Sequence, residues 1–455
     1  MVTTRDEVDA LLDTALSHST AEQTEVLYYG DDQALTRFAN SQIHQNVREH
    51  DRSMQVRVVD RQRIGVASTN RLDEASIRAT VERAMSIAER SEPNPKAGDL
   101  PGPNERDADP DSGFVAATAE ASPEQRAAGA RAVIAAGMAE QLIVSGSFAT
   151  GVSTLAVANS RGLHTRQRTT RAALVTVMLD SYESGAATGY ANAGSTDVGQ
   201  IDAEAVGREA ADKGARSRGA EALEPGEYTV VLEEYAVATI LEYLAFIGFS
   251  GLAVEEGRSF MEIGKAVMGD NVSIWDDGLD PSGLPSPIDF EGVAKQRVDL
   301  IVDGVASAVV HDAATGPRAG TRSTGHALPA PNVWGPLATN LFMRTGDTPK
   351  AELLAGMGRG IWVTRFHYVN PVHPKKAILT GMTKDGTFLV ENGRFVRPIL
   401  NFRFTQSIPE AFSAVEAISS EARTLPGEYI GGYRVPALRI GRFNFTGVTA
   451  REGAG

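Results

Sequence analysis

The chain contains no cysteine. Disulfide bonds, thiolate zinc sites, iron–sulfur clusters and cysteine nucleophiles are therefore all excluded. The absence does not fix the compartment, but it does exclude a small secreted scaffold held together by disulfides.

Positive charge is also scarce. The 44 Lys and Arg residues are outnumbered by 58 Asp and Glu residues, and the formal net charge is −14 at pH 7. Such a surface repels phosphate backbones. We therefore expect no general nucleic-acid binding.

Long hydrophobic runs are missing as well. The first 20 residues place apolar side chains on one face of a helix, but acidic residues interrupt them, which is not the pattern of a signal peptide. The most apolar later stretch, 237–252, is too short to span a bilayer. We expect a cytoplasmic protein with no membrane association.

What is present is an ordinary globular composition. Of the 455 residues, 42% are hydrophobic and 22% are charged, and this length is enough for two or three domains. We predict an α+β protein with a mixed α/β N-terminal domain over 1–220 and a β-rich C-terminal domain over 221–455. A proline-rich segment at about 91–122 is expected to form a surface loop, because its prolines exclude a regular helix or a central strand.

Hydrophobic spacing predicts the individual elements. The expected helices are 1–20, 73–90, 123–139, 202–218 and 233–246. The expected strands are 25–29 (followed by a turn at Gly30), 35–47, 54–59, 64–67, 141–148, 154–160, 172–181, 227–232, 298–302, 305–310, 361–366, 377–381 and 387–390. Residues 391–394, with Asn-Gly at their centre, predict a hairpin turn. No repeat of fixed period is evident.

Named catalytic motifs are absent: there is no P-loop, no GxSxG and no HExxH. Of the eight histidines, His367 and His373 lie six residues apart in a proline-containing segment. Because Pro371 and Pro374 flank the second one, we expect a loop there. Two imidazoles with a carboxylate could bind zinc; the alternative is a rigid surface loop with incidental histidines.

Acidic residues cluster at three places. Glu233 and Glu234 open a predicted helix, where carboxylates favour the positive end of the helix dipole, so we interpret them as a cap. Asp276-Asp277 and the run from Asp289 to Glu291 could gather around a cation, although acidic turns are common without one.

The order of segments along the chain resembles the TldD/PmbA (TldE) family, which includes a heterodimeric metallopeptidase complex. The matching segments are 56–59, 63–68, 158–162, 225–232, 257–260, 289–292, 300–305, 323–325, 340–341 and 390–393. The resemblance implies a mixed α/β domain followed by a β-rich one.

The resemblance also shows a departure at the metal site. Active TldD-type subunits carry HExxH on the helix that corresponds to 233–246, with a cysteine as third ligand. Here the corresponding region, which includes Glu234, Tyr235 and Thr239, has neither histidine; shifting the alignment by one residue, to Glu233 and Ala238, gives none either. The resemblance therefore implies a PmbA/TldE-like subunit with no catalytic residue, metal or cofactor of its own.

The remaining expectations are also implied by the resemblance. The partner would be an HExxH-containing TldD-like paralogue that holds a zinc-type metal, with possible homodimers in isolation. Together the two would degrade or trim unfolded, extended peptides and process peptide precursors. Two alternatives remain open: a self-contained peptidase with a metal site rebuilt from His367 and His373, and a regulatory binding protein that is not an enzyme.

Overall fold

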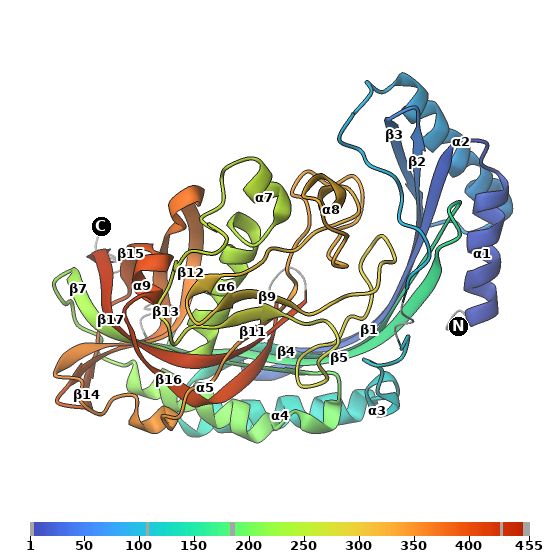
Figure 1. The fold of residues 1–455 in the computed structure, drawn as a ribbon. Coiled ribbons are helices and arrows are strands. Elements are labelled where there is room, and N and C mark those ends of the chain that lie inside the picture. Colours follow the sequence, from blue (N-terminus) through green and yellow to red (C-terminus); the bar gives the residue numbers. More distant parts are fainter. Residues whose placement is uncertain (1–3, 106–108, 183–186, 428–430, 449–455) are drawn as a thin grey trace.

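The structure is a computed structural model that describes residues 4–105, 109–182, 187–427 and 431–448. It contains two sheets, and no strand of the described residues belongs to both. Figure 1 shows the first sheet running beneath and beside the second, with helices on its outer face. The α+β class is confirmed. Within the described ranges, no helix is both long enough and apolar enough to cross a membrane.

The first sheet has six antiparallel strands in the order β3-β2-β1-β4-β5-β6. Its strands are β1 (Gln23–Ala39), β2 (Gln42–Asp60), β3 (Arg63–Thr69), β4 (Ile143–Asn159), β5 (His164–Leu179) and β6 (Thr188–Ser195). Its helices are α1 (Arg5–Ser17), α2 (Glu74–Arg90), α3 (Ala116–Ala119), α4 (Pro123–Ala139) and α5 (Ala203–Arg216), with a short 3-10 turn η1 (Val198–Gln200).

Two expectations for this sheet were wrong. Gly30 does not form a turn, because β1 continues through it to Ala39, and the hairpin turn lies at Asn40 and Ser41, inside the segment expected as one strand. Similarly, the segments 141–148 and 154–160 belong to the single strand β4. Pairing on both sides of β1 and β4 keeps their glycines extended, so tertiary context overrides local turn propensity.

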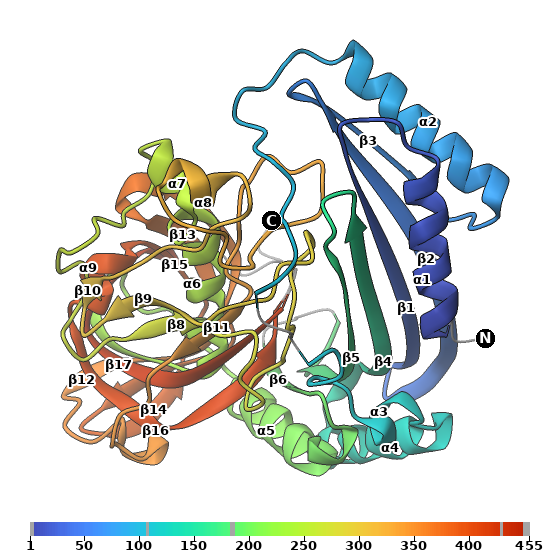
Figure 2. The ribbon, with the colours of Figure 1, turned by 45° about the vertical axis from the view of Figure 1, so that its right-hand side comes forward.

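The first sheet is built from two similar halves. Each half is a helix, three antiparallel strands and a second helix: α1, β1–β3 and α2, then α4, β4–β6 and α5. The halves meet where β1 pairs with β4 (Figure 2). The structure thus repeats an arrangement that has no fixed period in the sequence.

The helix that ends each half lies very close to its last strand. A Cβ atom built on Gly65 of β3 would come 1.9 Å from the carbonyl oxygen of Ala84 in α2, and one on Gly189 of β6 would come 2.0 Å from that of Ala210 in α5. Glycine at these two positions therefore allows backbone-to-backbone contact between helix and strand.

The second sheet holds the remaining eleven strands. They are β7 (Gly226–Leu232), β8 (Ile274–Asp276), β9 (Val298–Val302), β10 (Val305–Ala306), β11 (Asn340–Met343), β12 (Arg359–His373), β13 (Ile378–Glu391), β14 (Arg394–Pro398), β15 (Phe402–Ser407), β16 (Val415–Pro426) and β17 (Gly432–Val448). Because β7 pairs with both β12 and β17, the pairings β7-β12-β13-β15-β17 close into a ring. Residues 377–381 and 387–390 are one strand, and the strand expected over 305–310 is reduced to β10.

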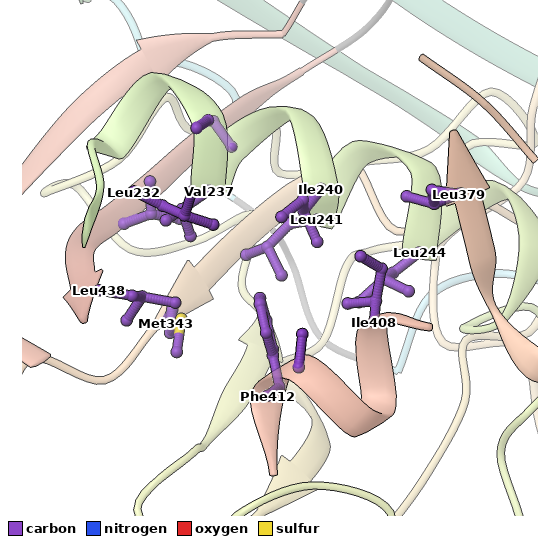
Figure 3. Close-up of a cluster of buried hydrophobic side chains, with 14 of the residues drawn as sticks. Leu232, Val237, Ile240, Leu241, Leu244, Met343, Leu379, Ile408, Phe412 and Leu438 are labelled. Carbon is purple, nitrogen blue, oxygen red and sulfur yellow. The ribbon is translucent and has the colours of Figure 1, made fainter. Parts of the chain in front are cut away.

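The core of this part forms around helix α6 (Glu234–Ile247). Val237, Ile240, Leu241 and Leu244 are fully buried and point toward Met343, Ile408 and Phe412 (Figure 3). The short helices α7 (Gly251–Glu255), α8 (Thr315–Arg318) and α9 (Ile408–Phe412) and the 3-10 turns η2 (Lys350–Glu352) and η3 (Pro374–Lys376) complete the element list. The hairpin turn expected at 391–394 is confirmed, since Asn392 and Gly393 both have positive φ.

The close approach of helix and strand predicts a stability effect. Replacing Gly65 or Gly189 with Ala should lower the free energy of unfolding by about 1–3 kcal/mol, because the added methyl group must displace backbone. Chemical denaturation of the two variants measures this. Gly102→Ala is the matched control, because nothing lies within 4 Å of its Cβ position. Equal stability of all three variants would contradict the proposed contact.

Candidate functional site

The candidate site lies at the start of α6, where β7 leads into the helix. Glu233 occupies the N-cap position and Glu234 the first helical position, and both are buried, with 2% and 3% of their surface exposed. The Glu233 side chain forms no capping hydrogen bond. Glu233 and Glu234 thus stand at the helix start as expected, but the Glu233 carboxylate points into a cluster of charged groups and does not bind the helix N–H groups.

Glu233 is held by four side chains. Its Oε2 accepts from the ammonium of Lys213 at 2.8 Å and, more weakly, from Lys350 at 3.4 Å, and its Oε1 accepts from Trp362 Nε1 at 2.6 Å and Thr364 at 3.2 Å. Burial by itself raises the pKa of Glu233, but the charges of Lys213 and Lys350 outweigh it and lower the pKa to about 2. The carboxylate is thus ionised and fully paired inside the protein.

Lys350, from η2, binds both acidic residues. Its ammonium lies 2.6 Å from Glu234 Oε2 as well as 3.4 Å from Glu233. Burial lowers the pKa of Lys350, but the two carboxylates more than compensate, so the net shift is upward. A cation of the protein itself therefore occupies the space between the two carboxylates.

Tyr235 connects this cluster to the first sheet. Its hydroxyl accepts from the backbone N–H of Asn192 in β6 at 3.2 Å and lies 3.1 Å from Glu209 Oε1 of α5. Burial and the charge of Glu209 raise the pKa of Tyr235 well above its ordinary value. Glu209 in turn pairs with Lys213 at 2.7 Å and with Arg423 of β16 at 2.8 Å. The phenol is therefore neutral and serves as a link between the two sheets.

A groove of about 1130 Å³ opens beside these charges. Its polar lining includes Glu209, Glu234, Lys350, Trp362 and Arg423. Segments 193–197 and 421–424 both line the groove, where the end of β6 lies against β16. The groove is thus charged at its base and bordered by strand backbone.

The residues at the start of α6 do not fit a catalytic zinc ion. Thr239 donates its hydroxyl to the backbone oxygen of Tyr235 at 3.0 Å, and Ala238, in the alternative alignment, has no ligand atom. Across the described part of the chain, no three His, Asp or Glu side chains gather as a metal site requires. Glu233 and Glu234 are already paired with Lys213 and Lys350, so neither carboxylate is free to bind a metal cation.

His367 and His373 lie on strand β12, not on a loop, so that expectation was wrong. Irregular pairing with β13 accommodates Pro371, as bulges allow. His373 is exposed and its Nδ1 accepts from the N–H of Lys376 at 3.3 Å, while the ring of His367 packs against Tyr368. Neither residue belongs to a group of three metal ligands in the described ranges.

The other acidic segments are bound by the protein's own groups. Asp276 lies 2.8 Å from His326 Nε2, and Glu291 lies 2.9 Å from Arg57 of β2, which also binds Glu25 at 2.7 Å. Asp289 accepts backbone N–H groups of Glu291 and Val293 at 2.9 Å each. Asp289 therefore accepts the N–H groups of its own turn, and Glu291 joins the C-terminal part of the chain to strand β2 of the first sheet.

Sequence analysis missed the groups that neutralise Glu233. Lys213, Lys350 and Trp362 lie 20, 117 and 129 residues away from it along the chain. No local pattern marks them as partners. The only sequence feature pointing to them is the pair of acidic residues before an otherwise apolar helix, since buried carboxylates require cations.

Comparison with known proteins places the chain in a family. Models described as PmbA/TldA metallopeptidase domain 1, central domain and C-terminal domain match residues 24–88, 116–218 and 225–447, respectively. These matches cover most of the chain, which therefore belongs to the PmbA/TldD metallopeptidase family. The boundary expected near residue 220 remains a prediction.

Individual relatives agree with this assignment. The metalloprotease PmbA of Escherichia coli O157:H7 is 24% identical over 86% of both chains. A shorter match, 36% identical, covers 22% of this chain and 24% of an uncharacterized protein of Methanocaldococcus jannaschii. The crystal structure of TldE from Thermococcus kodakarensis has the same fold, with a TM-score of 0.86 and 18% identity over 97% of this chain and all of that one.

The buried charge cluster predicts a large cost for removing one cation. Lys213→Met should lower the free energy of unfolding by about 3 kcal/mol, because it leaves the buried Glu233 with less compensation. Arg208→Ala on the same helix is the matched control. It removes an exposed pair with Glu204 and should change stability by less than about 0.5 kcal/mol. Chemical denaturation compares the two.

The stability that Glu233 contributes should depend on pH. The pKa of Glu233 is about 2 in the fold, against an ordinary 4.5. Its stabilisation is therefore present above pH 4.5 and is lost as pH falls from 4.5 towards 2. The difference between wild type and Lys213→Met should shrink over that range; a difference independent of pH would contradict the role of Glu233.

The two histidines of β12 predict the opposite outcome. Replacing both His367 and His373 with Ala should leave metal content unchanged and alter stability by no more than about 0.5 kcal/mol at the exposed His373. Elemental analysis and denaturation measure the two quantities. A loss of activity in an assembled complex, at unchanged stability, would instead show that this end of β12 is part of the working site.

Proposed function

We propose that this chain is the subunit without a catalytic metal in a TldD/TldE-like metallopeptidase complex. The observation that supports it most directly is the ion pair of Lys350 with Glu233 and Glu234. At the helix where the active members of the family hold their metal, this chain has a fixed ammonium between two carboxylates. Because the ammonium of Lys350 already pairs with both carboxylates, these side chains are not available as zinc ligands.

The partner would be an HExxH-containing TldD-like paralogue, which supplies the zinc-type metal and activates water. This chain retains the whole framework around α6, including its buried core and the closed ring of strands. A framework kept without the metal ligands is best explained by a packing role. We propose that the β-rich part of the chain pairs with the paralogue and that the two enclose one cavity.

The substrate class would be unfolded, extended peptide, including peptide precursors. The groove beside α6 supports this, because strand backbone borders it at β6 and β16. Backbone pairing with a strand edge holds an extended peptide without demanding a particular sequence. The lining has a negative net charge, because two cations, Lys350 and Arg423, face five carboxylates: Asp197, Asp202, Glu209, Glu234 and Glu421.

Reconstitution tests this proposal. Mixing the purified chain with its HExxH paralogue should yield one stable complex by size-exclusion chromatography and restore cleavage of an unstructured peptide that a chelator abolishes. The interface should bury on the order of 2,000 Å² or more, as obligate interfaces do. Elemental analysis should find zinc in the paralogue and no stoichiometric zinc in this chain.

The controls separate the alternatives. A complex with a paralogue whose HExxH glutamate is replaced by Gln should form but not cleave. About one zinc per chain with chelator-sensitive cleavage by this chain alone would favour a self-contained peptidase. No association at micromolar concentration, with the paralogue fully active alone, would favour a regulatory binding protein.

A further inference from the structure

Arg126 of α4 is a buried cation without a counter-ion. Only 2% of its surface is exposed, and its Nη1 donates to the backbone oxygen of Ala121 at 2.9 Å and to Thr150 Oγ1 at 3.0 Å. No carboxylate of the described residues forms an ion pair with it, and its Nε has no hydrogen-bond partner there. Charged side chains are seldom fully buried unless they are paired, so this guanidinium lacks an anion.

The nearest acidic residue on the same helix does not fill this role. Glu124 lies in the first turn of α4, is exposed, and attracts Arg126 through space without an ion pair. The positive charge of Arg48, on the other side, repels Arg126. The fold therefore brings two guanidinium groups towards each other and supplies no carboxylate to Arg126.

A hollow of about 360 Å³ lies beside Arg126. The register of the first sheet builds its floor: Ala34 of β1 is opposite Arg48 of β2 on one side and opposite Thr150 of β4 on the other. The small Ala34 side chain between two longer ones leaves the space open. Arg126 and the segment 119–123 close it from above.

The charges around the hollow sum to one positive charge. Arg48 and Arg126 contribute two guanidinium groups, and Asp32 contributes one carboxylate. Asp32 is already bound by Arg48 through two hydrogen bonds, at 2.9 and 2.7 Å, and lies 3.2 Å from His50 Nδ1. Its charge is therefore largely neutralised on the rim, and the side of the hollow at Arg126 remains positive.

We infer that this hollow binds one small oxyanion, and that a phosphate group fits its donors best. Guanidinium groups bind phosphate through parallel N–H donors, and the hydroxyl of Thr150 and the amide of Asn46 add neutral donors at the wall. The site is separate from the groove at α6, because no residue lines both. The inference therefore does not rest on the proposed peptidase function.

Titration with inorganic phosphate tests the site in the full-length chain. Calorimetry at fixed ionic strength, in a chloride buffer, should show saturable binding of one phosphate per chain. Arg48→Gln should raise the dissociation constant by about tenfold or more, because it removes a charged donor. Its side chain is 56% exposed, so the variant should keep the fold. Arg126→Gln should abolish binding.

Arg37→Gln is the matched control. Arg37 is an exposed residue of the same strand as Ala34, lies on the opposite face of the sheet, and donates to Gln45. This variant removes the same charge and should bind phosphate as the wild type does. Competition by acetate would support the site and show that carboxylates also enter it. No saturable phosphate binding, or the same weakening in Arg37→Gln as in Arg48→Gln, would overturn the inference.

Discussion

The burial of Glu233 constrains the rest of the structure. An ionised carboxylate with 2% exposure is tolerated only when cations and hydrogen-bond donors surround it. Lys213 comes from the last helix of the first sheet, Trp362 from a central strand of the second, and Lys350 from the turn before that strand. Satisfying one side chain therefore fixes how α5, α6, η2 and β12 lie against one another. The same contacts place the ammonium of Lys350 between Glu233 and Glu234.

Two buried cations, Lys213 of α5 and Arg126 of α4, differ in whether a carboxylate balances their charge. Lys213 lies between Glu209 and Glu233, at 2.7 and 2.8 Å, so its charge is balanced inside the protein. Among the residues that the structure describes, Arg126 donates hydrogen bonds to a carbonyl and a hydroxyl and forms no ion pair, and a hollow lies beside it. Complete pairing is typical of a structural role, whereas an unbalanced buried charge next to a hollow is typical of a binding site. The distinction rests on the partners and not on burial, which is nearly the same.

Family membership rests on the fold and on the matched segments, whereas the chemistry depends on the side chains at the start of α6. The fold matches that of a TldE structure over almost the full length, and the family models cover all three segments. At the start of α6, however, the side chains form a closed network of ion pairs. A shared fold supplies the groove and the framework, while a few side chains decide whether metal chemistry is possible there.

The sequence alone determined the helices and strands that follow from the spacing of neighbouring apolar residues. The helices expected over 73–90 and 123–139 follow from apolar spacing, and the strand and helix around Leu232 follow from composition; the structure has the first two at Glu74–Arg90 and Pro123–Ala139. The ordered segments of the resemblance and the missing HExxH also needed no structure. Tertiary structure alone decided the length of β1 and β4, the place of His367 and His373 on a strand, and the partners of Glu233. Strand pairing and charge neutralisation join residues more than a hundred positions apart, and local spacing carries no information about such contacts.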